Sequence, residues 1–146
     1  MSSKLLSPRE LRVWHAFKLM GDDVLRRVGR DITENTGLSG PEFGVLSRLA
    51  GLGKGEMRQQ TLATMMDWDK SRLSHQLTRM KERGLIERRS TGGKTVLVVL
   101  TKLGQEKLDA ARPVHAESVR RNLLSRLSEE QTATIVRVSN ILGEDE

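Results

Sequence analysis

The side chains of this chain that are best suited to recognition chemistry are cationic and hydrogen-bonding groups spaced closely along residues 70–83. Arginine can donate two parallel hydrogen bonds to guanine, and glutamine can pair with adenine, both from the major groove of a DNA duplex. The small serines of this stretch let a backbone approach bases or phosphates. The candidate contacts are Lys70, Ser71, Arg72, Ser74, His75, Gln76 and Arg79. Their types and spacing predict a surface that binds double-stranded DNA.

Positive charge is concentrated around this stretch. Residues 54–102 contain eleven lysines and arginines against five aspartates and glutamates, so this block carries the whole formal net charge of +6. Such an imbalance indicates a region that binds a polyanion. The alternative is a basic surface that is merely solvated. Three further cations are expected to contact phosphates: Arg58, Arg88 and Arg89. A fourth, Lys94, is expected to reach the adjacent backbone or the minor groove.

Other chemistries are disfavoured by what the sequence lacks. The chain has no cysteine, which excludes disulfides, thiolate metal sites and cysteine nucleophiles. Its three histidines do not have the spacing of a helical metal site, and no nucleophile–base arrangement or phosphate-binding glycine loop occurs. We therefore expect a protein that is not an enzyme and has no metal or cofactor. With no run of about 20 apolar residues and no signal-peptide pattern, we expect it to be cytoplasmic, with no membrane partner.

Helix starts are marked by a recurring signal. Ser7-Pro8-Arg9-Glu10, Ser39-Gly40-Pro41-Glu42 and Ser128-Glu129-Glu130-Gln131 each place a serine three residues before a glutamate or glutamine. This spacing is the capping-box pattern. It predicts helices that run from these starts to about residues 36, 50 and 142.

The middle of the chain predicts two further helices. A short one fits residues 58–66, with Leu62, Met65 and Met66 facing inward. A second runs over residues 70–83, after an aspartate cap. It has one apolar stripe at spacings of four and three, which is helical. The residues of that stripe are Leu73, Leu77 and Met80.

The periodicity then changes from helical to extended. Residues 85–89 and 95–100 are predicted to be two strands of a hairpin, because the second is rich in β-branched residues and the loop between them contains glycine. Thr101 should cap the next helix. Pro113 is expected to kink or break that helix, since proline lacks an amide donor and clashes with the preceding turn.

Two short helices joined by a tight turn and followed by a β-hairpin are typical of a winged helix-turn-helix. We therefore predict a mainly α fold with a small β-hairpin wing: a winged helix-turn-helix plus a helical dimerisation region. Residues 1–146 form a single domain, with the DNA-binding lobe at 38–101 and the dimerisation region at 1–37 and 102–146. The C-terminal helices offer more apolar surface than a peripheral helix needs. These apolar residues are Leu123, Leu124, Leu127, Ile135, Val138, Ile141 and Leu142.

Residues 67–88, DWDKSRLSHQLTRMKERGLIER, resemble the recognition helix and first wing strand of the MarR family, the multiple-antibiotic-resistance regulators. Residues 98–104, VVLTKLG, resemble the wing exit of that family, V-x-L-T-x-x-G. The resemblance covers nearly the whole chain in the same order. It implies a homodimer whose terminal helices interlock, and a repressor, less often an activator, that a small ligand releases or modulates. Family wings usually carry Asp-Arg-Arg where this chain has Gly92-Gly93-Lys94, which leaves entry of this wing into the minor groove open.

Three residues could form an effector pocket in this architecture: Trp14 and His15 in the first helix, and His115 after the proline. The ligand expected there is a small aromatic or phenolic molecule. The alternative is that the histidines lie on helix surfaces or pack in the core, and that Trp14 is a core residue.

These features predict a sequence-specific, double-stranded-DNA-binding transcription regulator. It is expected to be a ligand-responsive repressor, acting as a homodimer on a pseudo-palindromic operator with half-sites about 10 base pairs apart. The alternative is a non-enzymatic ligand-binding or scaffolding protein whose basic lobe contacts an acidic partner. The operator, the regulated genes, the effector and the sign of regulation stay open at this stage.

Overall fold

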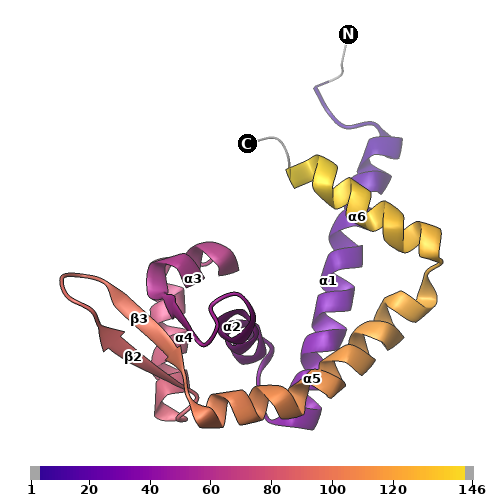
Figure 1. Ribbon diagram of the computed structural model, residues 1–146. Coiled ribbons are helices and arrows are strands. Elements are labelled where there is room, and N and C mark those ends of the chain that lie inside the picture. Colours follow the sequence, from indigo (N-terminus) through magenta and orange to yellow (C-terminus); the bar gives the residue numbers. More distant parts are fainter. Residues whose placement is uncertain (1–3, 144–146) are drawn as a thin grey trace. The chain divides into compact units, whose positions relative to one another are not determined.

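The computed structural model describes residues 4–143 and is mostly helical (Figure 1). Its elements are, in order, α1 (Pro8–Thr36), α2 (Gly40–Gly51), β1 (Glu56–Arg58), α3 (Gln59–Met66), α4 (Lys70–Glu82), β2 (Ile86–Ser90), β3 (Val96–Leu100), α5 (Lys102–Asn122), a 3-10 turn (Leu124–Arg126) and α6 (Glu129–Gly143). The predicted fold class, mainly α with a small β-hairpin wing, is confirmed. We call the β2–β3 hairpin the wing below.

The chain divides into two compact units. The first, which we call the core unit, comprises residues 31–115. The second, the terminal unit, comprises the described residues 4–30 and 116–143. Helices α1 and α5 contribute residues to both units, so the chain passes from one unit to the other within these helices.

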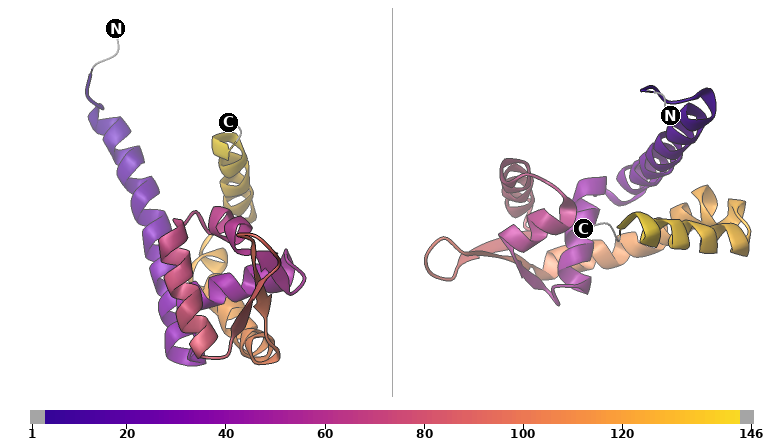
Figure 2. Two further views of the ribbon diagram at one scale, coloured as in Figure 1. Left: turned by 90° about the vertical axis from the view of Figure 1, so that its left-hand side faces the viewer. Right: turned by 90° about the horizontal axis from the view of Figure 1, so that it is seen from above.

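The core unit contains every buried hydrophobic residue of the described chain. Helices α2, α3 and α4 pack beside the sheet, and the loop of the wing extends beyond them (Figures 1 and 2). The largest fully buried side chains are Leu38, Val45, Leu46, Leu49, Leu62, Leu73, Leu77, Met80, Leu85, Ile86, Val98 and Leu108. They come from all these elements, so one apolar core fixes the position of α4 relative to the wing.

The sheet has a third strand that the sequence did not predict. β1 pairs antiparallel with β3, which also pairs with β2, giving the strand order β1-β3-β2. Met57 lies opposite Val98 and is buried against it, while its neighbours in β1 are exposed. Three residues are too few to display a period of two, so this strand is stabilised by its partner rather than marked by a local pattern.

All three predicted capping boxes form. At α1 the Ser7 hydroxyl accepts the Glu10 N–H, while the Glu10 carboxylate accepts the Ser7 N–H. Ser39 with Glu42 and Ser128 with Gln131 repeat this exchange at α2 and α6. The helix starts are thus fixed by local hydrogen bonds, which explains why sequence alone could locate them.

One local prediction is wrong and another is wrong in part. Of the kink or break expected at Pro113, the break does not occur, because helix α5 is continuous from Lys102 to Asn122, and the kink stays a prediction. Leu108 and Ala111 are fully buried just before the proline, and this packing offsets the loss of one backbone hydrogen bond. In α3 it is Ala63, beside Leu62, that faces the core, while Met65 is exposed.

Gly104 allows the first turn of α5 to touch the base of the wing. A Cβ atom at this position would lie 2.1 Å from the Leu85 carbonyl oxygen, far inside van der Waals contact. Thr101 fixes the same turn, because its hydroxyl donates to the Gly84 carbonyl and accepts the Gly104 N–H. The sequence T-x-x-G after the second wing strand therefore has a steric cause in this chain.

Candidate nucleic-acid interface

Helix α4 has two chemically distinct faces. Its buried stripe, Leu73, Leu77 and Met80, is the one that the sequence predicted. Asp69 caps the helix by accepting the Arg72 N–H at 2.7 Å. The exposed cationic and uncharged polar residues of the helix are Lys70, Ser71, Arg72, His75, Thr78, Arg79 and Lys81, and the acidic Glu82 is exposed at its last position. This surface has the form that a helix needs to enter a major groove, apolar inside and cationic outside.

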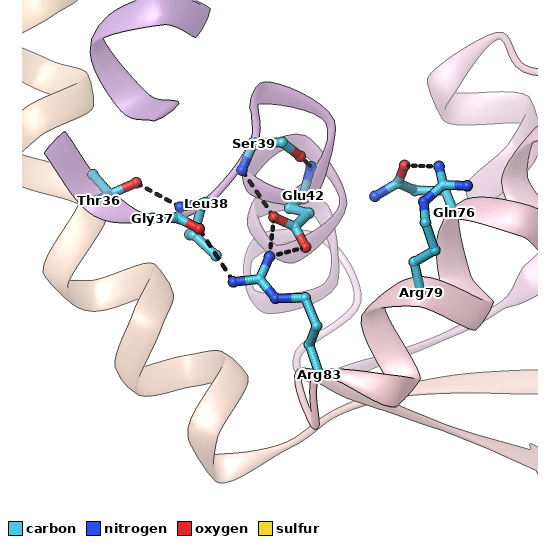
Figure 3. A network of polar contacts seen from close by, with 8 residues as sticks. All are labelled: Thr36, Gly37, Leu38, Ser39, Glu42, Gln76, Arg79 and Arg83. Atoms are coloured by element: carbon cyan, nitrogen blue, oxygen red, sulfur yellow. Dashed lines mark hydrogen bonds and ion pairs between the residues drawn. The ribbon is translucent and has the colours of Figure 1, made fainter. Parts of the chain in front are cut away.

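Gln76 is not on that exposed face, contrary to the sequence prediction. Only 8% of it is exposed. Its Oε1 accepts a hydrogen bond from Arg79 Nη2 at 2.8 Å (Figure 3). The residue lies beside the apolar stripe. The buried face of α4 is therefore wider than the stripe of Leu73, Leu77 and Met80 alone. Gln76 therefore orients the exposed Arg79 through its amide oxygen.

Arg88 was predicted to contact phosphates, but the structure ties it to α4. Its Nη2 donates to the Ser74 carbonyl oxygen, and burial lowers the pKa of the guanidinium from its ordinary value. Its buried Nε has no hydrogen-bond partner among the described residues. Ser74 itself is half-buried. The pair connects β2 to the middle of α4 and so holds the wing against this helix.

A second connection, between α2 and the end of α4, was not predicted (Figure 3). Glu42 is 5% exposed, and its carboxylate accepts the Ser39 N–H and two hydrogen bonds from the Arg83 guanidinium. The same guanidinium donates to the Gly37 carbonyl oxygen at 3.1 Å. The sequence identified Glu42 as a capping residue and Arg83 as a cation. Their pairing across 41 positions has no local signal.

Three of the predicted cations line one hollow of about 360 Å³. Arg58 comes from the end of β1, Lys70 from the first turn of α4 and Lys94 from the wing loop. Ala63, Leu73 and Val96 form apolar parts of its wall, and no acidic residue lines it. Helix α3 begins at this hollow without a side-chain cap, so its first N–H groups add to the positive potential.

The remaining predicted residues are distributed over both units. Arg89 is exposed on β2 and pairs weakly with Glu87 at 3.5 Å.

In the terminal unit, Trp14 and His15 are both exposed on α1, and the Trp14 ring lies 6.3 Å from that of Phe17. In the core unit, His115 stacks on Phe43 at 4.6 Å, and burial lowers the pKa of this histidine. The grouping of Trp14, His15 and His115 as one effector pocket stays a prediction.

Within residues 4–143 no three acidic or histidine side chains are grouped closely enough to hold a metal ion. None of the helices that the structure describes is long and apolar enough to cross a membrane.

Comparisons with known proteins extend over both units. A family model described as "Domain of unknown function (DUF7343)" matches residues 44–100, which run from α2 to the end of β3. None of the curated proteins matches the chain. Solved structures match it over nearly its whole length. AbsC, a MarR family transcriptional regulator from Streptomyces coelicolor, is 28% identical, with 97% of both chains covered and a TM-score of 0.88.

Two further structures bear on the site. Sco3205, a MarR family regulator of the same organism solved in complex with DNA, is 25% identical, with 97% of this chain and 91% of that one covered and a TM-score of 0.89. The organohalide-sensing regulator RdhR-CbdbA1625, solved with 2,4-dichlorophenol, is 18% identical, with 97% and 88% covered and a TM-score of 0.76. The last likeness concerns the fold alone. The resemblance indicated by the recognition-helix and wing motifs is thus confirmed: this chain has the winged-helix fold of the MarR family transcriptional regulators over almost its entire length.

Proposed function

We propose that this protein is a transcription regulator that binds double-stranded DNA sequence-specifically, with α4 in the major groove. One observation carries the proposal: α4 buries its apolar stripe in the core unit and presents a cationic, hydrogen-bonding face beside the wing. Sco3205, whose structure matches 97% of this chain, was solved in complex with DNA, which supports a DNA-binding role for the same fold here.

The exposed residues of α4 are assigned different roles by their positions. Arg72, His75 and Arg79 have donors that can reach base edges. Lys70 and the other two cations of the hollow are placed to contact backbone phosphates, which fix register without reading sequence. Gln76 and Arg88 act indirectly, by orienting Arg79 and by holding the wing against α4.

The proposal includes a homodimer. In the described terminal unit no hydrophobic residue is buried, whereas large apolar side chains are exposed along α1 and α6. Soluble chains rarely leave so much apolar surface uncovered, and a second copy would supply an identical apolar partner under two-fold symmetry. Two copies of α4 then bind half-sites about 10 base pairs apart, on a pseudo-palindromic operator. The exposed apolar residues include Leu11, Trp14, Phe17, Met20, Ile135, Val138, Ile141 and Leu142.

The most specific part of the proposal is that a small aromatic or phenolic molecule binds this regulator as its effector. The dichlorophenol in RdhR-CbdbA1625 supports this class of ligand, through a likeness of fold. Thermal-shift measurements with phenols and aromatic acids test it, and a stabilising compound should also change the affinity of the protein for its selected DNA site.

The central experiment is a selection of bound duplexes from random DNA, followed by competition at physiological salt. We expect a pseudo-palindromic site to be preferred over random DNA by about 10³-fold or more. Equal affinity for the selected duplex, for random DNA and for an acidic polymer would contradict the proposal and favour a basic lobe that binds acidic partners without reading sequence.

A further inference from the structure

Trp68 and Arg72 make a direct contact at the start of α4. The Arg72 Cζ lies 4.0 Å from the centre of the Trp68 ring, with the cation over the ring face. The backbone N–H of Arg72 is meanwhile held by the Asp69 carboxylate at 2.7 Å. Both ends of this arginine are therefore fixed by the two residues that precede the helix.

The position of Trp68 follows from the tight turn between α3 and α4. Asp67 ends α3 in the left-handed region, with φ of 53°. Its successor, Trp68, donates its backbone N–H to the Ala63 carbonyl oxygen at 3.0 Å, and it is half-buried. Helical side chains lean toward the helix N-terminus, so Arg72, in the first turn, lies over this ring. The residue that carries the ring is thus held to α3 through its backbone.

Stacking on a ring engages the face of a guanidinium and leaves the donors in its plane free. Three neighbouring arginines, at positions 79, 83 and 88, use in-plane donors within the protein. Arg79 donates to Gln76, Arg83 to Glu42 and Arg88 to the Ser74 carbonyl. No hydrogen bond or ion pair involves the Arg72 side chain within the described part of the chain. Arg72 is thus ordered and still able to donate two parallel hydrogen bonds outward.

We propose that Trp68 is a positioning residue that holds the Arg72 guanidinium ready to bind a guanine in the major groove. Arginine with two parallel donors fits the O6 and N7 acceptors of guanine. This inference rests on the proposed DNA-binding function and adds to it a specific base and the residue that sets the specificity.

The expected size of the effect follows from the cost of ordering a side chain. Immobilising a flexible side chain on binding costs about 0.5–1.5 kcal/mol, and Trp68 removes this cost by ordering Arg72 beforehand. Loss of the ring should therefore weaken binding to the selected site about two- to tenfold. Loss of Arg72 itself should cost about 10- to 100-fold.

The test is a double-mutant cycle on the full chain, measured against the selected duplex and against random DNA. Trp68→Leu keeps an apolar side chain but removes the ring, whereas Trp68→Phe keeps a smaller ring. We expect Trp68→Leu to weaken binding to the selected site only, Trp68→Phe to retain part of the affinity, and Trp68→Leu to have no further effect once Arg72→Ala is present. Thermal melting of each variant checks that the fold is kept.

The base is tested by replacing guanines of the selected site with 7-deazaguanine, which lacks the N7 acceptor. At one guanine in each half-site, this change should weaken binding of the wild type, by less than Arg72→Ala does because the O6 acceptor is kept, and should have little effect on the Arg72→Ala variant. If no guanine behaves in this way, the assignment of Arg72 to guanine is overturned.

Two outcomes separate the inference from the proposed function. If the wild type prefers its selected site but Trp68→Leu weakens binding to selected and random DNA equally, or acts additively with Arg72→Ala, the positioning role is overturned and the regulator proposal stands. If the wild type shows no preference for any selected site, the proposed function is overturned and the inference falls with it.

Discussion

The core unit and the terminal unit solve the problem of burying apolar surface in different ways. The core unit closes a hydrophobic core within one chain, from Ile32 to Ala111. In the described terminal unit no hydrophobic residue is buried, and Trp14 and Phe17 are each about half exposed. The first unit therefore resembles an independently folding domain, whereas the second has the surface of one half of an interface. The comparison shows that the core unit buries its large apolar side chains within the chain, whereas the described terminal unit leaves its own exposed. This difference is what the proposed homodimer would explain.

The largest test of this difference removes α6. A chain ending at Ser128 lacks the apolar face of α6, and we expect it to sediment as a monomer. Since a monomer reaches one half-site only, its affinity for the selected operator should fall to the level of random DNA, about 10³-fold weaker. A truncated chain that still sediments as a dimer would show that α6 is not needed for the interface.

A pair of matched substitutions compares packing in the two units. Gly104→Ala, in the core unit, forces a Cβ atom against the Leu85 carbonyl oxygen and should destabilise the protein by about 2 kcal/mol or more. Gly21→Ala, within α1 of the terminal unit, meets no atom within 4 Å and should stabilise the helix by up to about 1 kcal/mol. Chemical denaturation measures both. Equal effects of the two changes would mean that the units do not differ in packing as described.

A third test compares a buried ion pair with an exposed one, both within the core unit. Arg83→Ala leaves the buried Glu42 carboxylate without its cation. Because the Arg83 side chain is itself half exposed, we expect a loss of about 2 kcal/mol in the free energy of unfolding, below the range for fully buried pairs. Arg89→Ala removes an exposed pair with Glu87 and should cost less than about 0.5 kcal/mol. A similar loss in both variants would show that the link between α2 and α4 contributes little.

The smallest effect concerns His115. Burial lowers the pKa of this histidine below its ordinary value of 6.5, so the unfolded chain binds a proton more readily than the folded one. The neutral imidazole therefore contributes its full stability above pH 6.5, and this contribution is lost as the pH falls toward the lowered value. Melting temperatures from pH 7.5 to 5 should show this loss, and His115→Phe should remove it while keeping the stack on Phe43. An unchanged pH profile in that variant would assign the dependence to other groups.

Much of the fold could be predicted because its signals are local. The capping serines and the stripe of Leu73, Leu77 and Met80 depend on residues within one or two helical turns. The missed features depend on distant partners. β1 forms only because β3 offers it an edge, and Glu42 meets Arg83 across 41 positions.

The candidate interface follows the same rule. The sequence placed Arg72 and Arg79 on the exposed face of α4 because helical spacing decides this. It could not place Gln76 or Arg88, since their surroundings are set by how α4 packs against the core and against β2. The stacking of Arg72 on Trp68 joins two residues only four positions apart. A cation four residues after an aromatic residue at a helix start is the signal that could have revealed it.

The contact at Gly104 has a mechanical consequence. Where the first turn of α5 meets the base of the wing, main chain rests on main chain, with no side chain between them to change rotamer and absorb a displacement. The hydroxyl of Thr101 hydrogen-bonds to the backbone on both sides of this contact, at Gly84 and at Gly104. A displacement of this turn of α5 therefore displaces the start of the hairpin by nearly the same amount, because the two backbones are in direct contact.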